Sequence, residues 1–360
     1  MAAELHTTTE DVAEAEAEAP AAAHGVEQIA GDRSWLAHRL RDPRTLLSFA
    51  LAVALFLFIF RGLNLDLVAV WKTIRGANLG YFLLGFVFYY AAFVLRGLRW
   101  RTLLANVGYS KDQHPNLPNV GGLIEIIYLS WFVNCIVPAK LGDVYRGYLL
   151  KERGGVSFAR TIGTLLAERM IDLFILFGLL VVAGFLTVRD KLSGTILEVM
   201  GLGGALVVVL LIGLIVLRVF GDRVLMLLPH RFREIFTGLQ HGTLQSFRRS
   251  SLPLLIGFTA AIWLMEGLRL FWVVQSLGQG NLISLPVVIF IALASSLLTT
   301  LPLTPGGIGL VEGATIVVLG FFGVSNTIAG SISILDRLIN YWSIVVGGLI
   351  VYLITRRRRT

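Results

Sequence analysis

The chain has 360 residues, of which 56% are hydrophobic and only 15% are charged, and its mean hydropathy is +0.76. Soluble domains carry about 25% charged residues, so this composition excludes an ordinary soluble globular protein. The net charge of +8 comes largely from arginines that flank apolar runs. This placement indicates orientation against an anionic membrane surface and no nucleic-acid partner.

The N-terminal segment differs in composition from the rest of the chain. Residues 1–40 are rich in Ala and Glu at first and have almost nothing apolar to bury, which predicts a disordered tail. Four arginines then precede the first apolar run, so positive charge places this tail in the cytosol. Four consecutive arginines within 356–360 predict that the basic C-terminal end is cytosolic too.

Apolar runs recur at lengths near the roughly 20 residues that a helix needs to cross the hydrocarbon. Six spans are predicted at 46–60, 79–104, 161–187, 197–217, 252–277 and 327–354. The segment 61–75 is then an external loop, and 218–251, with six arginines, is a cytoplasmic loop. The sequence therefore predicts an all-α, polytopic membrane helix bundle.

Two further apolar segments are broken by proline and glycine. The segment 123–152 breaks at Pro138, and 286–323 breaks at Pro302, Pro305 and three glycines. Unpaired backbone groups cost several kcal/mol in hydrocarbon, so a broken segment must lie inside the bundle or line a wet cavity. We predict a re-entrant helical hairpin in each, with a plain external loop as the alternative for the second. The backbone amides of the second break would bind an anion at Gly306, Gly307 and Gly309.

Three short motifs occur twice in the same order. They read LRGLRW at 95–100 and MEGLRL at 265–270, then P-x-x-x-G at 138–142 and 305–309, then an acidic residue and Arg at 168–169 and 336–337. An odd number of crossings separates the copies, so the halves 44–190 and 195–355 would be inverted, each with three spans and one hairpin. Such repeats are typical of transporters, whose sites lie between the halves. Chance similarity between Leu- and Gly-rich helices is the alternative.

Charged residues inside the apolar segments are the candidate site. A charge at the bilayer centre costs about 2.5–3.5 kcal/mol, so such residues are usually paired and line a path. Arg169 is spaced to pair with Asp172, and Arg269 with Glu266. Glu312 has no partner nearby in sequence and needs a cavity, a cation from another helix or a proton. The candidate substrate-binding residues are Arg146, Arg169, Arg269, Arg337, Glu312, Asp336, Asp172, Glu168 and Asp143. The alternative is that these ion pairs only hold helices together.

Other polar and aromatic residues have simpler interpretations. Arg96 and Arg99 are expected to snorkel to the headgroups, and Glu125 at the start of the first hairpin is left open. The tryptophans at 131, 263, 272 and 342 are expected to pack or to anchor at the interface. No Gly-rich phosphate loop, Ser-His-Asp set or clustered His/Cys pattern occurs. We therefore expect no catalytic residues, no cofactor and no metal.

Three strings together resemble a known family. They are PAKLGDVYRGYLL (138–150), LLAERMIDL (165–173) and LTPGGIGLVEG (303–313). They look like the lysylphosphatidylglycerol synthase transmembrane family, the flippase-type membrane domains of bacterial multiple peptide resistance factors and their stand-alone relatives. The resemblance covers about 45–355 and implies two re-entrant hairpins and lipid translocation. We expect a bacterial inner-membrane protein, and the flanking arginines predict that both of its termini are cytoplasmic. The resemblance also implies that the family's polar positions are those occupied by Asp143, Arg146, Glu168, Arg169, Asp172, Glu312, Asp336 and Arg337.

The chain departs from the resistance factors because it lacks their C-terminal aminoacyl-transferase domain, which argues against lysyl-phosphatidylglycerol synthesis and against that lipid as cargo. The leading hypothesis is a flippase that moves an anionic or glycosylated lipid headgroup through a polar groove between the hairpins. Its partners are membrane lipids. The alternatives are an accessory or scaffold subunit of a glycosyltransferase or lipid-synthesis complex, and a membrane-embedded transferase that uses a lipid-linked donor.

Overall fold

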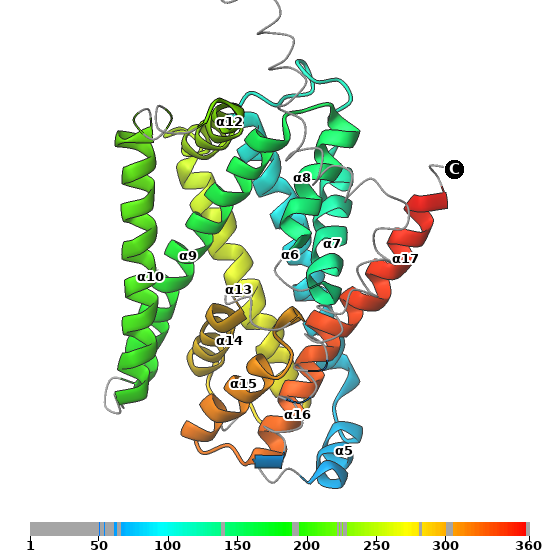
Figure 1. The fold of residues 1–360 in the computed structure, drawn as a ribbon. Helices are drawn as coiled ribbons and strands as arrows, with labels where there is room; N and C mark the ends of the chain where they lie inside the picture. The colour runs from blue at the N-terminus through cyan, green and yellow to red at the C-terminus, as the bar shows by residue number, and fades with distance from the viewer. Residues whose placement is uncertain are drawn as a thin grey trace, which may run out of the picture.

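The computed structural model describes residues 66–137, 141–188, 194–221, 229–280, 283–299 and 305–357, and a few isolated residues at 50–62, 223 and 225. Regular structure within these ranges is helical (Figure 1), which confirms the all-α prediction. The helices are α5 (Leu67–Arg75), α6 (Leu79–Asn106), α7 (Val120–Ile136), α8 (Leu141–Gly154), α9 (Phe158–Val188), α10 (Gly194–Val219), α12 (His230–Ser246), α13 (Leu252–Ser276), α14 (Leu285–Thr299), α15 (Leu310–Phe321), α16 (Asn326–Arg337) and α17 (Ser343–Arg357), with short turns η1 (Pro305–Gly307) and η2 (Leu338–Trp342).

Within the part of the chain that the structure describes, three long helical segments have the length and composition of membrane spans. They are α6, α13 and the continuous stretch 326–355 formed by α16, η2 and α17. Large apolar side chains are exposed on their outer faces, among them Val87, Leu264 and Val346. Such a surface suits hydrocarbon, which confirms a polytopic membrane helix bundle. The predicted tail 1–40 and most of the predicted first span 46–60 lie outside the described residues.

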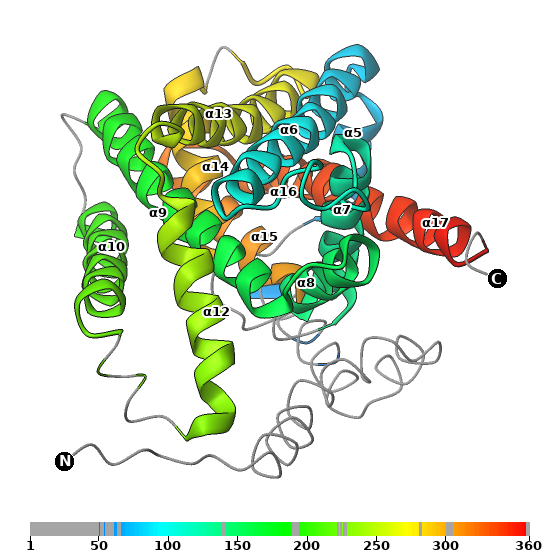
Figure 2. The same ribbon diagram turned by 90° about the horizontal axis from the view of Figure 1, so that it is seen from above.

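The two helices α6 and α13 run antiparallel and pack side by side (Figure 2). Their ends are tied by hydrogen bonds. The backbone amide of Asn78, which caps α6, donates to the carbonyl of Ser276 at 2.7 Å. At the opposite end, Asn106 Nδ2 donates to Ser251 Oγ at 2.6 Å. Each helix start is thereby fixed to the other helix's end.

Each broken segment forms a pair of short helices. In the first pair, α7 and α8 approach so closely that a Cβ added at Gly142 would lie 2.0 Å from the carbonyl oxygen of Ser130. The amide of Gly142 also donates to Asn134 Oδ1 at 2.8 Å. In the second pair, α14 and α15 are joined by a hydrogen bond between the hydroxyls of Ser295 and Thr315 at 3.2 Å. Pro138 and Pro302 lie outside the described residues, and re-entry into the membrane stays a prediction.

The segment 218–251 is not simply a loop, because it contains α12. This helix packs along α9, and small residues allow the contact: a Cβ at Gly163 would lie 2.5 Å from the Leu239 carbonyl oxygen, and one at Gly242 would lie 2.2 Å from that of Arg160. Thr243 Oγ1 also donates to the carbonyl of Gly163 at 3.2 Å. The segment was predicted to be a loop because it is rich in arginine, but close packing against α9 stabilises a helix within it.

The predicted external loop 61–75 likewise contains a helix, α5. Asp66 caps it, since its carboxylate accepts hydrogen bonds from the amides of Val68 and Ala69 at 2.9 and 3.1 Å. Val70 is buried, and its carbonyl lies 3.5 Å from the hydroxyl of Ser331 on α16. The helix was overlooked because its nine residues are too few to cross a membrane.

The contact between α9 and α12 predicts a large effect from a small change. Gly163→Ala should push the helices apart and lower the stability by about 1–3 kcal/mol, the usual cost of overpacking. The matched control is Gly178→Ala on the same helix, where an added Cβ meets nothing within 4 Å. That variant should be neutral or slightly more stable because Ala favours helix. Thermal unfolding in detergent measures both, and equal midpoints for the two variants would contradict the proposed packing.

Candidate functional site

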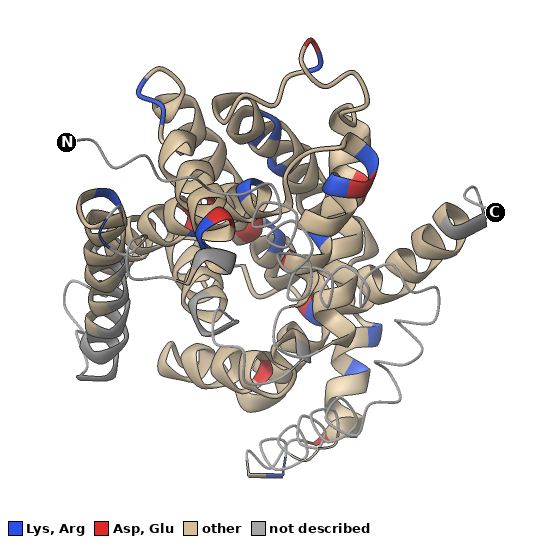
Figure 3. Cartoon of the chain, turned by 45° about the horizontal axis from the view of Figure 1, so that its top comes forward, with Lys and Arg blue, Asp and Glu red and all other residues tan. Residues whose placement is uncertain are grey.

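A cavity of about 440 Å³ lies among α6, α7, α9, α13, η1 and α16, between the two helix pairs. Charged residues of several helices line it, and Figure 3 shows blue and red segments in the interior of the bundle as well as at its ends. The charged residues of its wall are Arg96, Arg99, Asp143, Glu168, Arg169, Asp172, Glu266, Arg269, Asp336 and Arg337. A polar chamber therefore lies inside an apolar bundle.

The charges contributed by α8 and α9 are paired across helices. Arg99 of α6 is 1% exposed, and its Nη2 lies 3.2 Å from Glu168 Oε1 and 3.2 Å from Asp172 Oδ2. Arg169 donates to Asp143 of α8 at 2.9 Å. The predicted pair between Arg169 and Asp172 is therefore wrong. Spacing on one helix allowed it, but each side chain has an oppositely charged partner on a neighbouring helix.

The charges of α13 and α16 form a second network. Arg269 Nη1 lies 3.0 Å from Asp336 Oδ1, and its Nε lies 3.3 Å from Glu266 Oε2. The predicted contact between Arg269 and Glu266 is thus confirmed. Arg96 of α6 donates to Glu266 Oε1 of α13 at 2.8 Å and joins these two helices.

Arg96 and Arg99 do not snorkel to the headgroups, contrary to the sequence-based expectation. Only 7% of Arg96 is exposed, and its guanidinium lies 4.5 Å from the ring centre of Trp131. Both arginines point to partners inside the bundle, where a paired charge replaces its lost hydration with ionic hydrogen bonds. Trp131, expected to serve packing or interface anchoring, is part of the cavity wall.

Arg337 and Glu312 hold the glycine-rich break together. Arg337 Nε donates to Glu312 Oε1 at 2.8 Å, so a cation from another helix satisfies this glutamate. The other guanidinium nitrogens donate to the carbonyls of Gly306 and Gly307 at 3.1 and 2.9 Å. The amide of Gly309 donates to Glu312 Oε2 at 2.8 Å. Among the amides predicted to bind an anion, that of Gly309 is bound by the Glu312 carboxylate, whereas Gly306 and Gly307 contribute carbonyls to Arg337.

Tyr341 lies where the two helix pairs meet. Its hydroxyl donates to the carbonyl of Cys135, the last turn of α7, at 3.0 Å. On the other side, a Cβ at Gly306 would lie 2.4 Å from the Tyr341 ring, and Gly306 has a φ of +56°, which favours glycine. The turn of π-helix at Leu338–Trp342 carries Tyr341, and Tyr89 donates to the carbonyl of Asn340 within it at 3.0 Å. No sequence signal had selected Tyr341 or Tyr89.

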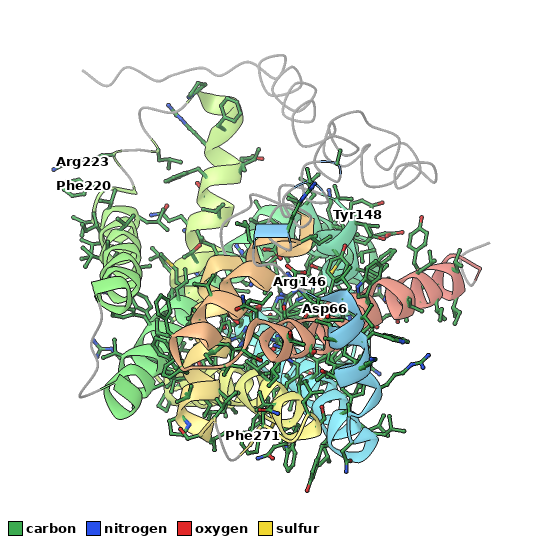
Figure 4. The ribbon with its side chains drawn as sticks, turned by 90° about the horizontal axis from the view of Figure 1, so that it is seen from below. Asp66, Arg146, Tyr148, Phe220, Arg223 and Phe271 are labelled. Atoms are coloured by element: carbon green, nitrogen blue, oxygen red, sulfur yellow. The ribbon has the colours of Figure 1, made fainter. Side chains whose placement is uncertain are left out.

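Two predicted site residues stand behind the cavity wall. Arg146 donates to both carboxylate oxygens of Glu168 at 3.0 Å and lies 3.9 Å from the ring centre of Trp100. Figure 4 shows it in the interior of the bundle. Glu312 is also absent from the wall and acts through Arg337. Glu125, the open case, pairs with Arg153 at 2.9 Å outside the cavity. Among the described residues no group of three or more His, Cys, Asp or Glu side chains could hold a metal.

Comparison with known proteins shows the family to which the chain belongs. Residues 45–348 match the family model described as the lysylphosphatidylglycerol synthase TM region. The chain belongs to this family. A UPF0104 membrane protein of Methanocaldococcus jannaschii is 36% identical over 226 residues, which cover 63% of this chain and 95% of the relative. Another, from Pyrococcus horikoshii, is 25% identical over 82% of this chain and 96% of its own length. Glycosyltransferase AglD of Haloferax volcanii is 27% identical over 73% of this chain, but over only 47% of its own length.

The degree of burial separates structural charges from accessible ones. Glu312→Gln should leave Arg337 buried without a countercharge and should destabilise the protein by about 3–5 kcal/mol. Asp143→Asn should cost about 0–1 kcal/mol because 26% of that side chain and 43% of its partner Arg169 are exposed. Thermal unfolding of the purified protein in detergent compares the two variants. A larger loss for Asp143→Asn would refute the assignment of Glu312 to a structural pair.

Proposed function

We propose that this protein is a lipid transporter that moves a polar headgroup across the bilayer while the acyl tails stay in lipid. The observation that supports it is the charged cavity at the centre of a bundle of membrane-length helices. A polar headgroup loses its hydrogen bonds to water in hydrocarbon, which makes unassisted crossing slow. A chamber lined by hydrogen-bonding side chains lowers this barrier.

The pair of Arg169 and Asp143 is the first contact proposed for the headgroup. Its side chains are 43% and 26% exposed, whereas both partners of the other ion pairs in the cavity wall are at most 11% exposed. Arg169 presents a planar set of donors that suits phosphate and other oxygen-rich groups. The buried arginines Arg269 and Arg337 would then orient the walls, and their carboxylate partners would fix the arginines.

Matched contacts in the two halves support the predicted inverted repeat. Arg99 meets Glu168 of α9, and Arg269 meets Asp336 of α16, which are the residues that the repeat aligns. A Cβ at Gly97 would meet Ile124 of α7, and one at Gly267 would meet Ile289 of α14. Arg96 and Glu266 occupy aligned positions and contact each other. Two halves of this kind could exchange conformations and open the cavity to either side in turn.

The transport test compares Arg169 of α9 with Arg153 of α8, since each arginine pairs with a carboxylate of the first helix pair. In liposomes that contain acyl-labelled phosphatidylglycerol or glucosyl diacylglycerol, dithionite quenching reports movement of lipid between leaflets. Arg169→Ala should slow the movement about tenfold or more, the effect of losing one charge-assisted hydrogen bond. Arg153→Ala, whose pair with Glu125 lies outside the cavity, should retain the wild-type rate. Wild-type rates for both variants would rule out the role given to Arg169.

The match to part of glycosyltransferase AglD favours a second candidate function. In it the chain is an accessory subunit that holds a glycosyltransferase or a lipid-synthesis enzyme at the membrane. Purification of a stable enzyme complex, together with no lipid movement by the purified chain in either lipid, would favour this function over transport.

We also propose a location in the bacterial inner membrane with both termini in the cytoplasm. Support comes from the arginines before the first predicted span and at 356–359, which the positive-inside rule assigns to the cytoplasmic side. A green fluorescent protein fused after Thr360 should therefore fluoresce, whereas alkaline phosphatase at the same point should be inactive. The opposite pattern would reverse the orientation.

A further inference from the structure

Several buried polar atoms in the cavity wall have no hydrogen-bond partner within the described part of the chain. The donors are Arg96 Nη1, Arg99 Nε, Trp263 Nε1 and two nitrogens of Arg269, Nε and Nη1. The acceptors are Asn340 Oδ1 and Asp336 Oδ1. Arg269 and Asp336 lie within ion-pair distance of each other at 3.0 Å, but without the geometry of a hydrogen bond.

This set is unusual because buried polar atoms in folded proteins almost always have a partner. The six residues that carry these atoms come from α6, α13, α16 and η2, so a single misplaced helix turn does not account for them. By contrast, Arg337 in the same wall donates to Glu312, Gly306 and Gly307. The unpartnered atoms therefore mark the part of the cavity that is incomplete without a bound molecule.

The chemistry of the missing molecule follows from the presence of both donors and acceptors. A phosphodiester only accepts hydrogen bonds, so it would satisfy Arg96 and Trp263 but leave Asn340 and Asp336 unpaired and would face a carboxylate. A hydroxyl group donates and accepts. The charge of the wall agrees, because its five arginines are balanced by five carboxylates and no net positive charge awaits an anion.

We infer that Arg96, Trp263, Arg269, Asp336 and Asn340 form a subsite for the hydroxyl groups of an uncharged polyol headgroup. The inference rests on the proposed function, since it takes the bound molecule to be a lipid. It narrows the cargo to a headgroup whose distal part carries neighbouring hydroxyls. The exposed pair of Arg169 and Asp143 remains free to contact the part nearer the tails.

The test measures binding by native mass spectrometry of the full chain in a polyoxyethylene detergent. Three lipids with the same dioleoyl tails are compared: glucosyl diacylglycerol, phosphatidylcholine and phosphatidic acid. Glucosyl diacylglycerol should bind about tenfold or more tightly than either phospholipid, as expected for two or more additional hydrogen bonds. Binding of phosphatidic acid as tight as that of the glucosyl lipid would overturn the subsite. Binding of all three lipids with equal affinity would overturn it too, because the unpartnered atoms would then be hydrogen-bonded to water.

Two tryptophans on α13 provide a matched pair of variants. Trp263→Phe removes one donor and keeps an aromatic ring, so binding of the glucosyl lipid should weaken about two- to tenfold, the effect of one net hydrogen bond. Trp272 also has a buried, unpartnered Nε1, but it stacks on Tyr81 outside the cavity wall, so Trp272→Phe should bind as the wild type does. Equal affinities for the two variants would overturn the inference.

Asn340→Leu removes the acceptor. Binding of the glucosyl lipid should become weaker in this variant, and binding of phosphatidic acid should not become tighter.

Competition by free methyl glucoside distinguishes a lipid headgroup from a soluble sugar. If methyl glucoside displaces the lipid at a similar concentration, the hydroxyl subsite is supported, but its ligand is a soluble polyol. Selective binding of glucosyl lipid without movement between leaflets would refute the proposed transport and leave the subsite standing. Transport of phosphatidylglycerol, together with no preference for the glucosyl lipid in binding, would refute the subsite and support the proposed transport.

Discussion

The fold depends on the requirement that charges inside an apolar bundle be paired. Removing a guanidinium and a carboxylate from water costs several kcal/mol for each ion, and only close, hydrogen-bonded pairs recover that cost. Arg99 meets this requirement with Asp172 and lies within ion-pair distance of Glu168, and Arg269 lies within ion-pair distance of Glu266 and Asp336. Because Glu168, Asp172 and Asp336 lie on other helices than the arginines that they contact, these pairs fix which helices are neighbours and how far each is rotated. The same charges surround the cavity.

Broken helices impose a second requirement, because every exposed backbone group at membrane depth needs a partner. The glycine-rich break obtains its partners from Arg337 and Glu312, and the end of α7 obtains one from Tyr341. Since Tyr341 also packs on Gly306, the two helix pairs meet at one residue. Arg337 and Tyr341, which stabilise the breaks, also line the cavity, so the same side chains serve the backbone and the cavity wall.

Some polar groups of the cavity wall have hydrogen-bond partners within the protein and others do not, and this difference indicates which of them can contact a cargo. Each guanidinium nitrogen of Arg337 donates a hydrogen bond, which assigns this residue to structure, whereas Arg169 is accessible and several atoms around Asn340 lack partners. A transporter needs walls that keep their shape and a few groups that can exchange partners with a cargo. In the transport proposed above, the balanced charge of the wall favours a headgroup recognised by hydrogen bonding rather than by net charge.

The sequence alone determined that this is a helical membrane protein, because the length and composition of each apolar run decide whether that helix can cross the hydrocarbon. It also located the broken helices and the contact between Arg269 and Glu266, since proline, glycine and a spacing of three residues act over one or two helical turns. It missed α5 and α12, whose stability comes from a cap and from packing. The sequence-based prediction paired Arg169 with Asp172, whereas its partner is Asp143. It also placed Arg96 and Arg99 at the headgroups, whereas both are buried. Only the tertiary structure decided these points, because the partner of a buried charge is chosen by distance in space, and helices far apart in sequence supply it.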